Sequence, residues 1–184
     1  MRAPRYAKDD DELKALAGQA RQWACPHCGR RKTLNAHGAL RGCAEDGPGK
    51  STLRGRRFFC SNRGMRPGCG RTFSVLLATL LAGATVRTGR LWQFYRARCA
   101  TGSVARAWAQ LRGGFSVEAA YRWWHRWQAG QFRIRAWLHA QRAPPETGSL
   151  LDHLTAVCGP ADPLAAYQLA RQEPWPATRP PPST

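Results

Sequence analysis

Apolar residues recur at helical spacing through much of the chain after residue 71. The spacing is that of one buried helix face, with apolar positions three and four residues apart. It predicts helices at 72–83, 90–100, 104–111, 117–129 and 131–142. Ser103 and Ser116 stand directly before two of these segments, where a serine hydroxyl can accept a hydrogen bond from a first-turn amide. The second half of the chain is therefore predicted to be a helical bundle.

The first seventy residues have a different pattern. Short runs at 33–38 and 56–59 are typical of strands, and the Gly- and Pro-rich stretch 47–51 between them is typical of a hairpin tip. The acidic residues near the start predict a mobile charged arm at 1–12, followed by a short helix at 12–22. The fold class that we expect is mainly α with a small β ribbon at the N-terminal end.

The last forty residues combine two short helical patterns with many prolines. We expect a linker at 146–149, short helices at 150–157 and 164–172, and a disordered tail from Pro174 to Thr184. The expected domains are a charged arm and helix at 1–22, a ribbon at 23–73, a helical domain at 74–143, and a Pro-rich linker with short helices and a tail at 144–184.

Two of the predicted helices, 104–111 and 117–129, are separated by a glycine-containing break at 112–115. A third predicted helix, 90–100, precedes them. This is the layout of a helix-turn-helix module, whose second helix enters the major groove of DNA.

A helical wheel divides segment 117–129 into two faces. The face expected in the core carries Val117, Ala120, Tyr121, Trp124 and Gln128, with Trp127 at its border; the opposite face carries Glu118, Ala119, Arg122, Trp123, Arg126 and Ala129, with His125 at the edge. Two arginines one turn apart around a small alanine fit a major groove, and an exposed tryptophan needs a partner on which to stack. The alternative is an amphipathic helix with a solvated charged face.

Four of the seven cysteines stand in two pairs, Cys25 with Cys28 and Cys60 with Cys69. A Cys-x-x-Cys turn directs two sulfurs to one point about 2.3 Å from a metal ion, and a structural zinc site takes four such ligands. A glycine follows each pair, Gly29 and Gly70, where a tight turn needs a residue without a Cβ atom. We expect these four cysteines to bind one Zn²⁺ ion in a zinc ribbon.

The spacing of the second pair is unusual, because eight residues separate Cys60 from Cys69. A loop of this length can bulge outward without moving the two sulfurs. His27, His37 and Cys43 are the competing ligands. An interpretation without a metal, in which the cysteines are free intracellular thiols, also stays open.

The charge of the chain indicates the class of partner. The formal net charge is +18, and 24 of the 29 basic residues lie between positions 13 and 143, against only three carboxylates, Glu45, Asp46 and Glu118. A coding bias can raise the arginine content, but it does not remove carboxylates from one segment alone. Such a field attracts a polyanion, and binding releases its condensed counterions.

Membrane insertion and catalysis are not expected. The longest apolar run, 75–84, is about half of the roughly 20 residues that a membrane span requires. An odd number of cysteines without a signal peptide fits reduced thiols and a metal, so we expect a cytoplasmic, nucleoid-associated protein. The three central carboxylates lie on a predicted hairpin and a predicted helix and cannot converge on catalytic metal ions, so we expect no enzymatic activity.

A series of motifs connects the cysteine pairs with the helices. It consists of Cys25-Pro26-His27-Cys28-Gly29, Gly38, Arg56-Arg57-Phe58-Phe59-Cys60 and Cys69-Gly70-Arg71-Thr72-Phe73, followed by the helix-turn-helix pattern. Over about residues 23–130 this series resembles the N-terminal DNA-binding part of certain bacterial insertion-sequence transposases. The resemblance implies a zinc ribbon and a helix-turn-helix that bind the ends of a mobile element. No acidic catalytic domain follows, which implies an accessory or repressor subunit with a separate transposase or a second copy as partner.

The sequence thus predicts a zinc protein that binds double-stranded DNA. The expected base contacts are Arg122, Trp123 and Arg126, with His125 beside them, and the expected phosphate contacts are Arg56, Arg57, Arg66, Arg71, Arg133 and Arg135. One alternative is an RNA-binding module, in which arginines and tryptophans stack on unpaired bases. The other is a protein adaptor with a Trp-rich face, whose affinity would respond little to salt.

Overall fold

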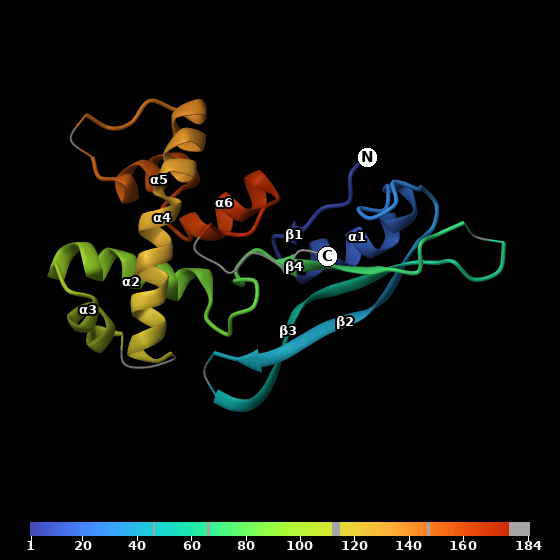
Figure 1. Ribbon diagram of the computed structural model, residues 1–184, viewed down its shortest axis with the longest axis horizontal. Helices are drawn as coiled ribbons and strands as arrows, with labels where there is room; N and C mark the ends of the chain where they lie inside the picture. Colours follow the sequence, from blue (N-terminus) through green and yellow to red (C-terminus); the bar gives the residue numbers. More distant parts are fainter. Residues whose placement is uncertain (46, 66, 112–114, 147, 177–184) are drawn as a thin grey trace. The chain divides into compact units, whose positions relative to one another are not determined.

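A computed structural model describes residues 1–45, 47–65, 67–111, 115–146 and 148–176 of the chain. The chain divides into two compact units, Met1–Ala78 and Thr79–Thr184. Within the described residues the protein is mixed α/β, with a four-stranded sheet in the first unit and five of the six α-helices in the second (Figure 1).

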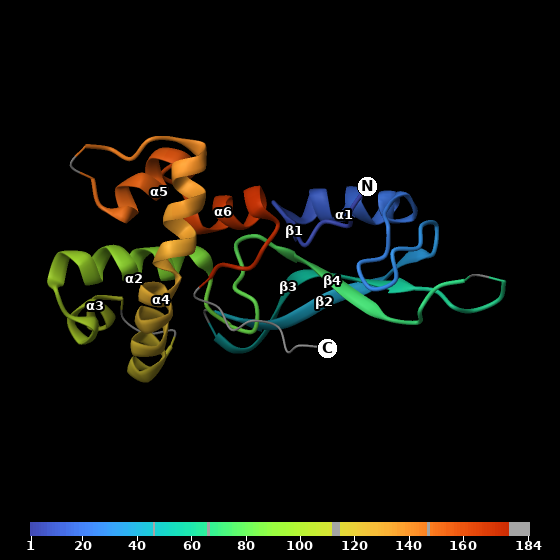
Figure 2. The same ribbon diagram turned by 45° about the horizontal axis from the view of Figure 1, so that its top comes forward.

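The sheet of the first unit has the strand order β1-β4-β3-β2. Its strands are β1 (Tyr6–Ala7), β2 (Leu34–Ala44), β3 (Gly47–Cys60) and β4 (Thr72–Leu77). β1 is parallel to β4, and the other neighbours are antiparallel. β3 pairs with β4 only from Gly55 to Phe59, so the rest of the long β2–β3 hairpin is a two-stranded ribbon (Figure 2). Residues 47–51 belong to β3 in this hairpin, and its turn contains Glu45.

A helix and two aromatic contacts build the core of the first unit. α1 (Asp10–Gln19) begins where Asp9 Oδ1 accepts a hydrogen bond from the Glu12 amide at 2.9 Å, and the 3-10 turn η1 (Ala20–Gln22) follows it. The Phe58 ring lies 5.3 Å from that of Trp23 and 5.4 Å from that of Phe73. These rings pack with Ala7, Leu13, Ala20, Cys25, Leu34, Cys60 and Val75.

The predicted mobile arm at 1–12 is wrong, because Tyr6 and Ala7 are buried and form β1 beside β4. The backbone continues this attachment, since the Leu76 amide donates to the Arg5 carbonyl at 3.0 Å. The start of the chain therefore belongs to the sheet.

The predicted helix at 72–83 is also wrong, because 72–77 is strand β4. Alternate residues Phe73, Val75 and Leu77 belong to the core of the unit, which is the two-residue period of a strand. An apolar run of this kind fits both periods, and pairing with β3 decides between them.

The second unit contains α2 (Thr88–Thr101), α3 (Val104–Gln110), α4 (Val117–Gln141), α5 (Leu150–Cys158) and α6 (Pro163–Arg171). Two predicted caps are present: Ser103 Oγ accepts from the Arg106 amide at 3.4 Å, and Ser116 Oγ accepts from the Ala119 amide at 3.3 Å. Each cap satisfies an amide that has no partner within its helix.

The expected break near residue 130 does not exist, because α4 continues through Gly130. Gly130 is buried, and a Cβ atom there would lie 3.0 Å from Pro176 Cβ. The close approach of the C-terminal segment explains why glycine stands in mid-helix despite its cost of about 1 kcal/mol relative to alanine.

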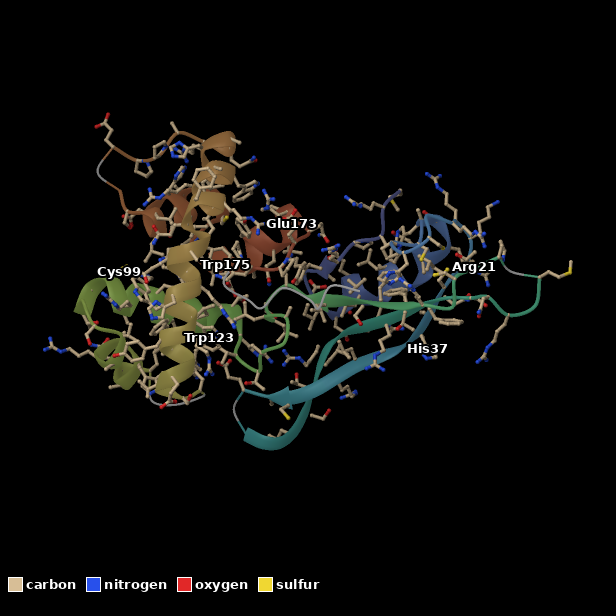
Figure 3. The ribbon with its side chains drawn as sticks, viewed as in Figure 1. Arg21, His37, Cys99, Trp123, Glu173 and Trp175 are labelled. Atoms are coloured by element: carbon tan, nitrogen blue, oxygen red, sulfur yellow. The ribbon has the colours of Figure 1, made fainter. Side chains whose placement is uncertain are left out.

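The C-terminal segment completes the core of the second unit, so the expected disorder from Pro174 is wrong for its first residues. Trp175 is fully buried, with its ring 5.8 Å from that of Trp127 and 5.0 Å from that of Tyr167 (Figure 3). Buried Gln168 holds the segment, since its Oε1 accepts from the Trp175 amide at 2.9 Å and its Nε2 donates to the Leu80 carbonyl at 3.0 Å. The remainder of the expected tail, 177–184, lies outside the described residues.

Candidate metal centre and nucleic-acid surface

The four predicted cysteines come together in the first unit. The sulfurs of Cys25 and Cys69 are 3.8 Å apart, as are those of Cys28 and Cys60, and all four lie within 4.8 Å of one another. A tetrahedron with metal–sulfur distances of about 2.3 Å places its sulfurs about 3.8 Å apart. The cluster therefore has the dimensions of a four-thiolate metal site.

Two backbone turns of the same construction present the sulfurs. In the first turn the Gly29 amide donates to the Cys25 carbonyl and the Cys25 amide to the Arg30 carbonyl, both at 2.9 Å. In the second turn the Gly70 amide donates to the Cys60 carbonyl and the Cys60 amide to the Arg71 carbonyl, again at 2.9 Å. Both glycines have φ of +72°, a left-handed conformation that favours glycine. We call these two turns the knuckles.

The eight-residue spacing leaves the second knuckle intact. The Gly68 amide donates to the Ser61 carbonyl at 3.0 Å, so the chain leaves the knuckle after Ser61 and returns at Gly68. Ser61 and Gly68 thus occupy the two places between the cysteines that Pro26 and His27 occupy in the first knuckle. A Cβ atom at Gly68 would lie 2.0 Å from the Ser61 oxygen, so only glycine fits this closure.

The surroundings of the sulfurs differ between Cys25 and Cys60. Burial raises the pKa of Cys25 to about 12. Burial acts in the same direction on Cys60, but hydrogen bonds from the Thr33 hydroxyl at 3.2 Å and the Cys69 amide at 3.3 Å, with the neighbouring thiols, lower its pKa to about 7. Donors directed at a sulfur stabilise the thiolate, which is the form that binds a metal.

The three competing ligands lie outside this cluster. His27 Nε2 is 3.2 Å from the Thr72 carbonyl oxygen, and His37 is exposed with its ring 5.9 Å from that of Phe59. Cys43 is exposed on β2, where it pairs with Ser51 in the distal part of the hairpin. Sequence reasoning also missed Thr33. Its hydroxyl reaches the Cys60 sulfur from the residue before β2 to the end of β3, and no sequence motif near Thr33 indicates this contact.

The first two turns of α4 present a different face from the predicted one. Trp123, which was expected to be exposed, is buried, and its ring lies 4.3 Å from that of Phe115 (Figure 3). Tyr121 and Gln128, which were expected in the core, are exposed. The physical reason is that the buried stripe of α4 runs along its whole length, through Ala120, Trp123, Trp127, Gly130, Ile134 and Leu138. A wheel drawn only over 117–129 lacks the last three of these residues.

The other predicted nucleic-acid contacts have varied exposure. Arg122, His125, Arg57, Arg71, Arg133 and Arg135 are exposed, Arg126 and Arg56 are half-buried, and Arg66 lies outside the described residues. Arg133 Nη2 is also 3.7 Å from Glu173 Oε2, an exposed pair. Such a pair contributes little and can exchange for a phosphate contact.

Comparison of the chain with protein-family models, with curated proteins and with solved structures finds no match in any of the three. In the described part of the chain, every helix is too short or too polar to cross a membrane. The arguments below therefore rest on the geometry of the chain itself.

Proposed function

We propose that the chain is a zinc-containing protein that binds double-stranded DNA with sequence preference. The metal centre would be structural, and α2, α3 and α4 would act as a helix-turn-helix. The observation that carries this proposal is the start of α4, where Tyr121, Arg122 and His125 are exposed while Trp123 anchors the opposite side. An exposed basic face on a helix with a fixed core face is what major-groove recognition requires.

Four cysteine sulfurs in a closed tetrahedral cluster support zinc as the metal. Thiolates select soft or borderline ions, and a site with four protein ligands leaves no coordination position for water or substrate. The metal would hold the first knuckle against β3 and the start of β4.

The packing of the three helices supports the recognition role of α4. Phe115, which directly precedes the Ser116 cap, places its ring 4.0 Å from that of Trp108 in α3, 6.2 Å from that of Phe94 in α2 and 4.3 Å from that of Trp123. One aromatic residue therefore fixes α4 against both earlier helices. Arg57, Arg71, Arg133 and Arg135 would add phosphate contacts, which set register without reading sequence.

A place in a mobile element, as an accessory or repressor protein, rests on the resemblance of the motifs alone. It predicts that the preferred site lies at the ends of such an element or in its promoter. Identifying the preferred sequence tests this part.

The experiment is selection of binding sites from a random duplex library, with Arg122→Ala plus Arg126→Ala compared with wild type. The double variant should lose sequence preference and keep weak non-specific binding. Arg133→Ala plus Arg135→Ala removes the same charge from the same helix and should weaken binding to all sequences alike. Preference that survives in the first variant would show that α4 does not read the bases.

A further inference from the structure

Four basic residues lie on three segments that backbone and side-chain hydrogen bonds connect around the two knuckles of the first unit. Arg21 lies in η1, Arg31 and Lys32 follow the first knuckle, and Arg63 lies in the loop of the second knuckle. The Lys32 amide donates to the Arg21 carbonyl at 3.2 Å, which ties two of these segments together. Arg21 is labelled in Figure 3. All four side chains are exposed.

The sequence around this group has few carboxylates. The sequence contains no Asp or Glu at positions 13–44 or 47–78. Lys14 pairs with Asp10 and Asp11 on α1, and none of the four basic side chains takes part in an ion pair among the described residues. The four basic side chains are therefore available to an external anion, and sequence reasoning assigned none of them a role.

The loop of the second knuckle is anchored at its base. The Arg63 amide donates to Ser61 Oγ at 3.4 Å, and Arg30 Nη1 of the first knuckle donates to the Pro67 carbonyl. In Figures 1 and 2 the described parts of the chain between β3 and β4, on either side of residue 66, extend beyond the ends of both strands. Met65, within this loop, is fully exposed.

A fully exposed methionine near cationic side chains is complementary to a partner with an anionic rim and an apolar interior. The minor groove of DNA has both features, because phosphates line its edges and stacked bases lie within it. Methionine is among the side chains that enter between base steps there, and arginine and lysine contact the flanking phosphates.

We propose that the metal end of the first unit is a second DNA-docking surface, in which Arg21, Arg31, Lys32 and Arg63 contact phosphates and Met65 enters the minor groove. This rests on the proposed function and adds a surface to the same partner. The metal centre acquires a further role in it, since the two knuckles that hold the metal also position the loop.

The first test measures the salt dependence of duplex binding by the full chain. Arg21→Gln, Arg31→Gln and Arg63→Gln are combined in one variant. Lys8→Gln, Arg41→Gln and Lys50→Gln form the control, which removes the same charge from exposed positions outside the knuckles. Each lost phosphate contact lowers the slope of log affinity against log salt by about 0.9, so the knuckle variant should lose about 2.7 and the control less than about 1. Equal losses in both would overturn the surface.

The second test uses a duplex containing 2-aminopurine, whose fluorescence rises when it is unstacked. Wild type and Met65→Leu should raise the fluorescence, while Met65→Ser should not, with its salt slope unchanged because no phosphate contact is lost. The same signal from Met65→Ser as from wild type would overturn insertion of Met65, as would the absence of a signal in all three.

Wild-type binding separates this inference from the proposed function. If wild type shows no salt-dependent duplex binding, both fail. If the affinity of wild type for duplex DNA falls steeply with salt and the two triple variants lose the same amount of slope, only the docking surface is contradicted. Binding to phosphatidylserine vesicles is measured as a third test. If the knuckle variant loses vesicle binding but keeps the wild-type salt dependence of DNA binding, the surface binds lipid and the proposal is overturned.

Discussion

The Cys25 sulfur accepts a hydrogen bond from the His27 amide at 3.4 Å, whereas a hydroxyl as well as an amide donates to the Cys60 sulfur. The Thr33 hydroxyl and the Cys69 amide lie 3.2 Å and 3.3 Å from it. They stabilise the thiolate, whereas burial of Cys25 favours the thiol and raises its pKa. The cluster therefore holds one sulfur that is ready for a metal near neutral pH.

This difference predicts how metal affinity changes with pH. Because the pKa of Cys60 is lowered to about 7, its thiol is ionised above that pH and protonated below it. Metal binding then releases one more proton below pH 7 than above it. The slope of log apparent metal affinity against pH should therefore be larger below about pH 7 than above it, by about one. Competition with a chromophoric chelator from about pH 6 to 8 measures this.

Thr33→Val removes the hydroxyl and should shift the change in slope to higher pH. Thr33→Ser keeps a hydroxyl and serves as the matched control. A single slope across the range in wild type would show that Cys60 is not distinguished from its neighbours.

At the scale of elements, α4 carries both a core stripe and an exposed basic face. The stripe continues from Ala120 to Leu138, so the helix is held along its full length. This arrangement fixes the backbone positions from which the exposed side chains near its start, Arg122 and His125, project.

The corrected face of α4 can be tested by stability. Trp123→Ala should destabilise the protein by about 3–5 kcal/mol, because it removes a large buried ring and leaves a cavity beside Phe115. Tyr121→Ala should cost less than about 1 kcal/mol, since nearly half of that residue, 46%, is exposed to solvent. Denaturant unfolding of both variants gives the two values. A larger loss of stability in Tyr121→Ala than in Trp123→Ala would show that Tyr121 faces the core, as the helical wheel predicted.

At the scale of the molecule, the chain has two separate cores of different composition. The core of the first unit includes Cys25 and Cys60 of the cysteine cluster, with Trp23 and Phe58 beside them. The core of the second unit is formed by α2 to α6 and the segment around Trp175, without any of the four clustered cysteines. Metal binding should therefore contribute to folding of the first unit alone.

Metal removal tests this separation. After chelation, and in Cys60→Ser, amide protection should fall in β3 and β4 and persist around Ile134 and Leu138 in α4. Hydrogen exchange by mass spectrometry, with metal content measured in parallel, reports both. Cys43→Ser, an exposed cysteine of the same unit, should keep the metal and the protection. Retention of the metal by Cys60→Ser, or equal loss of protection in both units, would contradict the assignment.

Features encoded by a few adjacent residues were determined by the sequence itself. The Cys25–Cys28 pair with Gly29 specified the first knuckle, and the serines at 103 and 116 specified two helix starts. Each depends on backbone geometry within about four residues, so no distant segment is needed to predict it.

Only the tertiary structure decided the features that depend on distant partners. Residues 72–77 became a strand because β3 offered unpaired backbone groups, although their apolar spacing also fits a helix. Trp123 turned inward and Trp175 joined the core because rings from other segments, Phe115 and Trp127, surround them. Burial of an apolar side chain is favourable wherever another segment excludes water from it. The spacing of apolar residues along the sequence does not identify which segment that is.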